Sequence, residues 1–564
     1  MQPLKGKLTG DLSWLILVIF LFACGCSQGK SDGSGGSEPG VSDALLPNEA
    51  KVIAKASVAF NAEGIGTDPA DLIWYVNDIE GGSSELGFVQ SGVYTAPALR
   101  PEDPIVEVRC RSKVDPRATA AATVQITSPW VKIYGGAEDD RAASVREDFD
   151  GNYVLAGHTG ANGWVFELDP DGNMLWETAY SGASYFTAIV PIEDGGCLAA
   201  GQTQVLRITS DGNLVWSKEL PYAPAFPGHD IIGIEPAQDG GFILASDYMT
   251  GGGGYVPGRA DIVKLNLDGS ITWRSVLQGP LYAAPYGYRQ DGAFSVAQAS
   301  DGGYVFAGWL GDSARSYLYE FYYCQPGSPS YPCPPVTQYR GLWVTKLRPD
   351  GSPIWAGRFG DVKPPHAVVR RIPAGGLILL VQTDRIGSGS VDFWILRLAD
   401  DGQLIWQHTY GGSGADRGYD IKPTADGGFI AVGETESYGY GGNDILILKL
   451  DAGGALQWQK TYGGTGSEQA FWVEQSSDGG YMVAGRTNSF GNGGFDALVL
   501  KLDSFGEVSA DCRLAAIPAV TMQAAAVARD AITAWFESVS TELREAPLDA
   551  GSTDSSVQTL CGLP

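Results

Sequence analysis

The sequence has few charged residues, few histidines and no apolar run of the length that a membrane-spanning helix needs. Lysine and arginine number 38 against 65 acidic residues, and the net charge of −27 argues against nucleic acid as a partner. The four histidines are scattered and no Cys-x-x-Cys pair occurs, so the sequence indicates no metal site and no other cofactor.

Glycine and aromatic residues are abundant instead. The 564 residues include 77 glycines, and 11% of the chain is aromatic and 44% apolar. This composition is typical of short strands joined by tight turns, and it argues against a coiled coil and against disorder. The length predicts two or more domains or one large repetitive domain, and we expect an all-β chain.

The N-terminus carries a targeting signal. Lys5 and Lys7 precede an apolar run of about ten residues, too short to span a bilayer, which predicts a signal peptide over residues 1–23. The run ends in Leu21-Phe22-Ala23-Cys24-Gly25-Cys26 and resembles the lipobox of bacterial lipoproteins. The resemblance implies acylation of Cys24, with Cys26 as the alternative; plain cleavage is the other interpretation. A lipid anchor would place the protein in the bacterial cell envelope, at the outer membrane or cell surface, with residues 24–48 as a flexible tether.

Six further cysteines divide into three pairs. An exported protein can keep disulfides, and we expect Cys324 with Cys333 and Cys512 with Cys561, because each pair brackets a local segment. Cys110 and Cys197 lie in apolar, strand-like runs and are expected to be buried thiols.

Residues 49–128 are predicted to form a small β-sandwich. Apolar and polar residues alternate over 72–76, 105–108 and 122–126, the period of half-buried strands. The stretches Trp74-Tyr75-Val76-Asn77 and Gly92-Val93-Tyr94-Thr95-Ala96-Pro97 resemble bacterial Ig-like domains, and this resemblance implies a spacer.

Residues 129–512 contain an internal repeat marked by a tryptophan at positions 130, 176, 216, 273, 355, 406 and 458. Most units hold an Asp-Gly-Gly turn and, before the tryptophan, an Asp-Gly turn, so each predicts a four-stranded antiparallel meander. Seven such sheets bury both their faces when packed radially, as in a seven-bladed β-propeller. The last unit lacks a tryptophan strand, and we expect the strand that begins at Trp130 to pair beside Leu502 and close the ring.

The repeats resemble the tandem repeats of about 50 residues, with Tyr-Gly-Gly and Asp-Gly-Gly signatures, of propeller-type bacterial lipoproteins. Residues 513–564 form a C-terminal extension. Apolar residues at helical spacing over 520–543 predict a helix there, and a strand-rich tail is the alternative that the resemblance implies.

The loops opposite the tight turns predict a binding face. The largest insertion, residues 311–340, is dense in aromatic residues that could stack on a ligand or pack the loop itself. The ligand-binding candidates are Tyr317, Tyr319, Phe321, Tyr322, Tyr323, Tyr331 and Tyr339. Asp140, Asp416, Asp444 and Asp496 recur beside loops in several units, so we expect them to fix those loops by hydrogen bonds.

Residues 49–564 contain no Gly-x-Ser-x-Gly nucleophile elbow and no phosphate-binding loop. The leading hypothesis is a membrane-anchored, non-catalytic propeller that binds an unknown protein or glycan. One alternative is a polysaccharide lyase or hydrolase, which predicts nonrepeated polar residues at the central channel. Another is an envelope-assembly scaffold, since Asp-Gly-x-x-x-Trp strands also resemble blades of an outer-membrane assembly lipoprotein.

Overall fold

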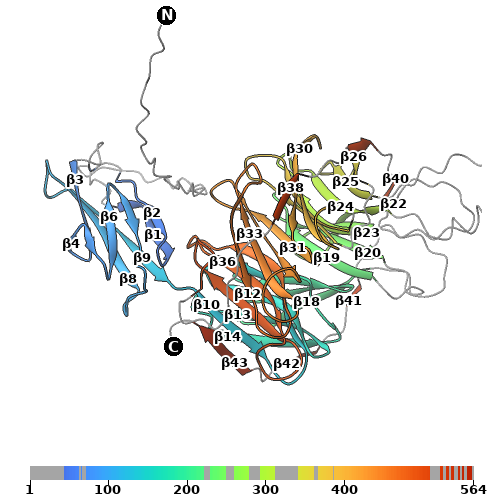
Figure 1. Ribbon diagram of the computed structural model, residues 1–564, viewed down its shortest axis with the longest axis horizontal. Coiled ribbons are helices and arrows are strands. Elements are labelled where there is room, and N and C mark those ends of the chain that lie inside the picture. Colours follow the sequence, from blue (N-terminus) through green and yellow to red (C-terminus); the bar gives the residue numbers. More distant parts are fainter. Residues whose placement is uncertain are drawn as a thin grey trace, which may run out of the picture. The chain divides into compact units, whose positions relative to one another are not determined.

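The computed structural model describes most of the chain from residue 44 onward. Residues 44–48, expected at the end of a flexible tether, lie instead in a strand that spans Ala44–Ile53. The described residues are 44–62, 65, 71–220, 229–248, 260–278, 292–310, 341–360, 366–384, 386–508, 521–524, 529–531, 535–538, 544–545, 549–551 and 556–561. All elements in this part are β-strands, which confirms the all-β prediction (Figure 1). No helix in the described ranges is long and apolar enough to cross a membrane.

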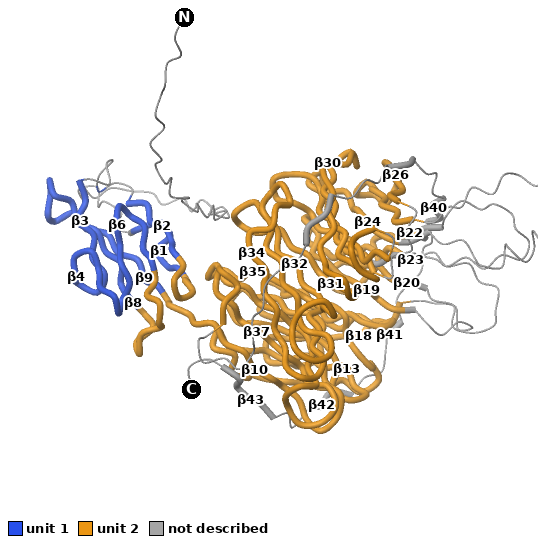
Figure 2. The backbone as a smooth tube through the Cα atoms, in the orientation of Figure 1, with its two compact units in different colours: residues 1–50, 57–95, 106–124 blue, residues 51–56, 96–105, 125–564 orange. Residues whose placement is uncertain are grey.

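The chain divides into two compact units (Figure 2). The smaller comprises residues 1–50, 57–95 and 106–124. Its strands belong to two antiparallel sheets, in the orders β1-β9-β8-β3-β4 and β2-β7-β6-β5. Their bounds are β1 Ala44–Ile53, β2 Ser57–Ala59, β3 Leu72–Val76, β4 Ile79–Glu80, β5 Gly82–Ser83, β6 Gly87–Gln90, β7 Val93–Thr95, β8 Ile105–Ser112 and β9 Thr119–Thr127. The sheets contact each other through β3, β5 and β6, and Trp74 is buried on β3.

The described residues of the larger unit form seven sheets, six of which begin with four consecutive strands. The first three are β11 Asp140–Glu147, β12 Tyr153–Thr159, β13 Asn162–Leu168, β14 Met174–Ser181; β15 Ala188–Pro191, β16 Cys197–Gly201, β17 Gln204–Ile208, β18 Leu214–Glu219; and β19 His229–Pro236, β20 Phe242–Tyr248, β21 Ala260–Leu265, β22 Ile271–Gln278. The next three are β23 Gly292–Gln298, β24 Tyr304–Leu310, β25 Gly341–Leu347, β26 Pro353–Phe359; β27 Ala367–Arg371, β28 Leu377–Thr383, β29 Asp392–Leu398, β30 Leu404–Gly411; and β31 Asp416–Pro423, β32 Phe429–Thr435, β33 Asp444–Leu450, β34 Leu456–Tyr462.

The seventh sheet joins the two ends of the repeat region. It contains β35 Glu468–Gln475, β36 Tyr481–Thr487 and β37 Asp496–Leu502, followed by β10 Trp130–Gly135. β10 pairs antiparallel with β37, with Trp130 opposite Lys501, as expected from the missing tryptophan strand. The pairing satisfies the hydrogen-bonding edge that β37 would otherwise expose.

The first strands of the sheets contact one another in a closed series, from β11 through β15, β19, β23, β27, β31 and β35 back to β11. The apolar core of this unit follows the same order. It contains seven clusters of buried side chains, each shared by two neighbouring sheets. One of them joins Trp130 and Tyr134 of the closing strand to Trp164 and Phe166 of the first sheet. Every sheet therefore depends on both neighbours for burial of its faces.

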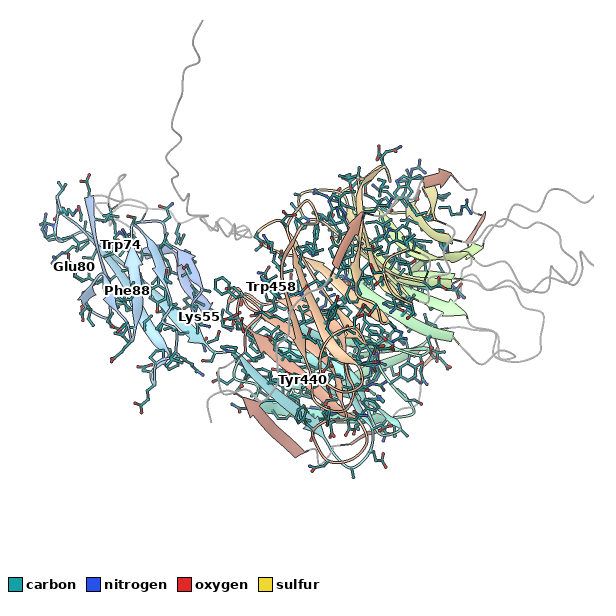
Figure 3. All side chains as sticks on the ribbon, viewed as in Figure 1. Lys55, Trp74, Glu80, Phe88, Tyr440 and Trp458 are labelled. Atoms are coloured by element: carbon teal, nitrogen blue, oxygen red, sulfur yellow. The ribbon has the colours of Figure 1, made fainter. Side chains whose placement is uncertain are left out.

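The repeated tryptophans pack each sheet against the next one. Each of the seven packs against a glycine in the turn that follows the third strand of the next sheet, where an added Cβ would meet the indole ring; the glycines are Gly172, Gly212, Gly269, Gly351, Gly402, Gly454 and Gly506. These glycines also have a positive φ, which a tight hairpin turn requires. Trp130 Nε1 donates a hydrogen bond of 3.0 Å to the Pro170 carbonyl in the same contact. Trp458, labelled in Figure 3, is the equivalent residue that packs on Gly506.

The helix expected over 520–543 is wrong where the structure describes those residues. Short strands lie there and continue towards the C-terminus: β38 Thr521–Ala524, β39 Arg529–Ala531, β40 Trp535–Ser538, β41 Arg544–Glu545, β42 Asp549–Gly551 and β43 Ser556–Cys561. In this order they pair with β30, β26, β22, β18, β14 and β10, so the tail adds a fifth strand to six sheets in reverse order. Backbone pairing with these open edges outweighs the helical spacing of the side chains.

Candidate functional site

Two tight turns of each sheet lie on one face of the larger unit, and the described Tyr-Gly-Gly connections lie on the other, which we call the loop face. This follows from the antiparallel order of the strands. On the turn face, the aspartate of an Asp-Gly-Gly turn forms an ion pair with a lysine or arginine of the third strand in five sheets. The pairs are Asp194 with Arg207, Asp239 with Lys264, Asp301 with Lys346, Asp426 with Lys449 and Asp478 with Lys501. These pairs are repeated, so they support the fold and not a specific ligand.

A cluster of charged side chains lies at the centre of the ring, on the turn face. Arg146 of β11 contacts Glu235 of β19 at 2.8 Å and Glu474 of β35 at 3.3 Å, although β19 is not a neighbour of β11 in the series of sheets. Arg370 contacts Asp420 at 2.6 Å. Trp472 lies under this cluster, with the centre of its ring 4.0 Å from Lys422 Nζ and 4.8 Å from Arg146 Cζ. Burial, together with the two arginines, lowers the pKa of Lys422 to about 8. Because each arginine of this cluster has a carboxylate partner, we assign the cluster a structural role.

A second cluster lies at the loop face of the same centre, and we call it the loop-side cluster. It is built from the same register position in three sheets, where Arg141 faces His158, Arg417 faces Glu434 and Gln469 faces Arg486. Tyr419 and Phe471 add two aromatic rings, which meet edge to face with centres 5.3 Å apart. All these side chains except Glu434 are partly exposed.

The charges of the loop-side cluster are not balanced. Glu434 is buried and both its oxygens are occupied, one by Arg417 at 3.0 Å and the other by the Gln469 amide. Arg486 donates Nε to Gln469 Oε1 at 2.7 Å. Neither Arg141 nor Arg486 forms an ion pair in the described part of the chain, and the buried Nε of Arg141 has no acceptor there. Burial, and secondarily Arg486, lowers the pKa of Arg141 to about 10.

Aromatic rings support the two unbalanced arginines. Arg141 Cζ lies 3.6 Å from the centre of the Phe471 ring, and Arg486 Cζ lies 5.8 Å from the same centre and 4.1 Å from that of Phe495. Burial and the positive charges of Arg141 and Arg486 lower the pKa of His158 to about 4, so this imidazole is neutral at physiological pH. The arrangement holds two guanidinium groups at a partly exposed surface, where an anion could approach them.

Pairs of carboxylates lie beside the Tyr-Gly-Gly connections. Asp140, Asp416, Asp444 and Asp496 each accept a hydrogen bond from a backbone N–H of an adjacent loop, at 2.6 to 3.1 Å, which agrees with their expected loop-fixing role. Asp444 and Glu468 converge on the Cα of Gly463, where a Cβ would meet both carboxylates. Burial, followed by the charge of Glu468, raises the pKa of Asp444 to about 7.

Replacing Asp444 by asparagine is expected to stabilise the protein at pH 8. The pKa of Asp444 is higher in the folded state than in the unfolded chain, so its stabilising contribution is complete below about pH 4 and is lost as the pH rises through about 7. The uncharged amide of asparagine does not undergo this loss, so the free energy of unfolding of the variant at pH 8 should exceed that of wild type by on the order of 2 kcal/mol. Thermal unfolding at pH 5 and pH 8 measures this gain in stability.

Asp416→Asn is the control. Asp416 accepts three hydrogen bonds, from Gly412, Ser437 and Thr435, and its replacement should destabilise the protein at both pH values. Equal stability of Asp444→Asn and wild type at pH 8 would contradict the coupling.

A small polar pocket of about 290 Å³ also lies on the loop face, in the connection between β32 and β33. It is lined by Glu436, Ser437, Tyr438, Gly439, Gly441, Gly442 and Asp444, and the neighbouring Tyr440 is exposed (Figure 3). No group of three or more metal-ligating side chains occurs in the described residues.

Most site residues expected from the sequence lie outside the described residues. These are Cys24, Cys26, Cys324, Cys333, Cys512 and the seven aromatic residues of 311–340; of Cys561 the structure describes only the backbone, in β43. Cys110 and Cys197 are buried free thiols, as expected, and burial raises the pKa of Cys197 to about 12. The loop-side cluster was not predicted. The sequence does contain a signal for this cluster. In three units the residue that follows the glycine of the second strand differs, being His158, Glu434 or Arg486, whereas the positions around it repeat from unit to unit.

No protein-family model matches the chain, and no curated protein sequence is significantly similar to it. Similar solved structures include a protein of unknown function from Bacteroides caccae, 12% identical, with a TM-score of 0.33, covering 59% of this chain and 94% of that one. A protein of unknown function from Dyadobacter fermentans is 15% identical, with a TM-score of 0.35, covering 65% and 98%. A quinoprotein alcohol dehydrogenase-like protein from Bacteroides thetaiotaomicron is 9% identical, with a TM-score of 0.33, covering 73% and 94%. Likenesses this weak carry no argument about activity.

Proposed function

We propose that this protein is an exported bacterial lipoprotein whose seven-bladed β-propeller binds a protein or glycan ligand without catalysis. The anchor would be the acylated Cys24, and the smaller unit would be an Ig-like spacer. The closed series of first strands and the seven shared core clusters support the propeller assignment. The observation that carries the binding role is the loop-side cluster, which gathers partly exposed polar and aromatic side chains whose facing pairs differ from sheet to sheet.

The first test combines a glycan array with a screen for hydrolase and lyase activity on the same polysaccharides. We expect saturable binding and no turnover. Phe471→Ala should then weaken binding at least tenfold, because it removes the ring beneath Arg141. Phe505→Ala is the matched control, since Phe505 is exposed on the turn face. Equal loss in both variants, or no loss in Phe471→Ala, would contradict binding at this cluster.

An enzyme is the second candidate, because nonrepeated polar residues at the centre of the ring are what a propeller enzyme requires. Glu434 and His158 are the residues of this cluster that could exchange a proton. Turnover of any polysaccharide, abolished by Glu434→Gln, would establish catalysis and reject the non-catalytic proposal.

A further inference from the structure

The loop-side cluster is positively charged, whereas the whole chain has a net charge of −27. At the turn face, Arg146 contacts two carboxylates and Arg370 contacts Asp420; within the loop-side cluster, Arg417 contacts Glu434 and Glu436. Arg141 and Arg486 form no ion pair with a described residue, and neither does Arg371 at the end of β27. The Arg141 and Arg486 guanidinium groups share one phenylalanine ring and repel each other. Glu434 and Asp139 offset part of this repulsion at Arg486, whereas leaving the partly buried Arg141 without a carboxylate carries a cost in stability. An anion bound between the two guanidinium groups would remove this cost.

The neighbours of the two arginines indicate what carries that anion. His158, Gln469 and Tyr419 are uncharged groups that donate and accept hydrogen bonds, and they suit hydroxyl groups beside the anion. Gln469 already donates to Glu434 and accepts from Arg486, so it offers its second N–H and its second oxygen lone pair. The net charge of −27 disfavours the approach of a polyanion, whereas it acts weakly on a ligand with a single negative charge. A planar guanidinium also matches a carboxylate in two-point contact.

We propose that the loop-side cluster binds the carboxylate of a sugar acid, a glycan unit with one carboxylate and several hydroxyl groups, through Arg141 and Arg486. The carboxylate lies between the two guanidinium groups, and the hydroxyl groups face His158, Gln469 and Tyr419. This inference rests on the proposed binding function and specifies its ligand class.

Calorimetric titration of the full chain with methyl glucuronide, methyl glucoside and acetate tests the proposal. We expect methyl glucuronide to bind at least tenfold more tightly than the other two. Arg141→Gln should reduce this affinity at least tenfold. The control Arg348→Gln, which makes the same charge change at an exposed turn, should stay within twofold of wild type. Because Arg141 has no ion pair to lose, Arg141→Gln should also unfold at the wild-type temperature or above it.

Each other outcome overturns the inference. Equal binding of methyl glucoside, or array hits confined to neutral glycans, would reject the carboxylate while leaving the proposed function intact. Equal binding of acetate would show an adventitious ion only. An Arg141→Gln variant that unfolds several degrees lower would show that the arginine serves the fold. Absence of binding to any of the probes rejects the sugar-acid site, and absence of binding to the whole array rejects the proposed function as well.

Discussion

Replacing Lys501 by methionine is expected to lower the free energy of unfolding by about 3–5 kcal/mol. The ammonium group of Lys501 is fully buried and lies 2.7 Å from a carboxylate oxygen of Asp478, which is 2% exposed. It also donates hydrogen bonds to the Tyr153 hydroxyl, at 2.8 Å, and to the Ser476 hydroxyl. Without Lys501 the Asp478 carboxylate stays buried with no countercharge, and this uncompensated charge is the main cost.

The effect should depend on pH in a defined direction. Burial alone would raise the pKa of Asp478, but Lys501 and the hydroxyl of Thr127 hold it below its ordinary value. In Lys501→Met that pKa rises, so protonation relieves the strain and the loss of stability should be smaller at pH 5 than at pH 8.

Denaturant titrations at both pH values measure this prediction. Lys460→Met is the matched control, because its partner Glu507 is 45% exposed and such pairs contribute about 0–1 kcal/mol. A second variant, Lys501→Met with Asp478→Asn, should recover part of the loss. A cost below 1 kcal/mol for Lys501→Met would contradict the role of this pair.

The sequence predicted the turns and the tryptophan strands because both are encoded locally. An Asp-Gly turn needs a positive φ at its glycine, and a tryptophan in each unit needs an apolar contact, so each signal recurs with the repeat. The pairing of β10 with β37 was also predictable, since one unit lacked a strand and another had one too many.

The tail and the loop-side cluster could not be predicted in the same way. The apolar residues of 520–543 fit a helix, and the strands described within this range (β38, β39 and β40) depend on sheet edges that only the assembled ring presents. Arg141 and Arg486 belong to opposite ends of the repeat region, and β11 contacts β35 and β36 because the ring closes. The ion pairs of the Asp-Gly-Gly turns could have been predicted from the sequence, because a lysine or arginine repeats at the matching position of the third strand.

A disulfide between β10 and β37 tests the closed ring most directly. Ile133 and Leu498 are opposite each other in this pair of strands, and their side chains share a core cluster. Cysteines across an antiparallel pair meet the distance that a disulfide requires. Oxidation of the variant Ile133→Cys with Leu498→Cys should therefore give a cross-link within one molecule, identified by mass spectrometry. It should raise stability by about 3–5 kcal/mol relative to the reduced variant, because the closed loop spans almost the whole repeat region.

The control places the second cysteine two positions along the same face, as Ile133→Cys with Leu500→Cys, since Leu500 pairs with Val131. We predict rapid cross-linking in the first variant and little in the second. Equal cross-linking in both variants, cross-links only between molecules, or none at all would contradict a ring closed by the first and last strands of the repeats.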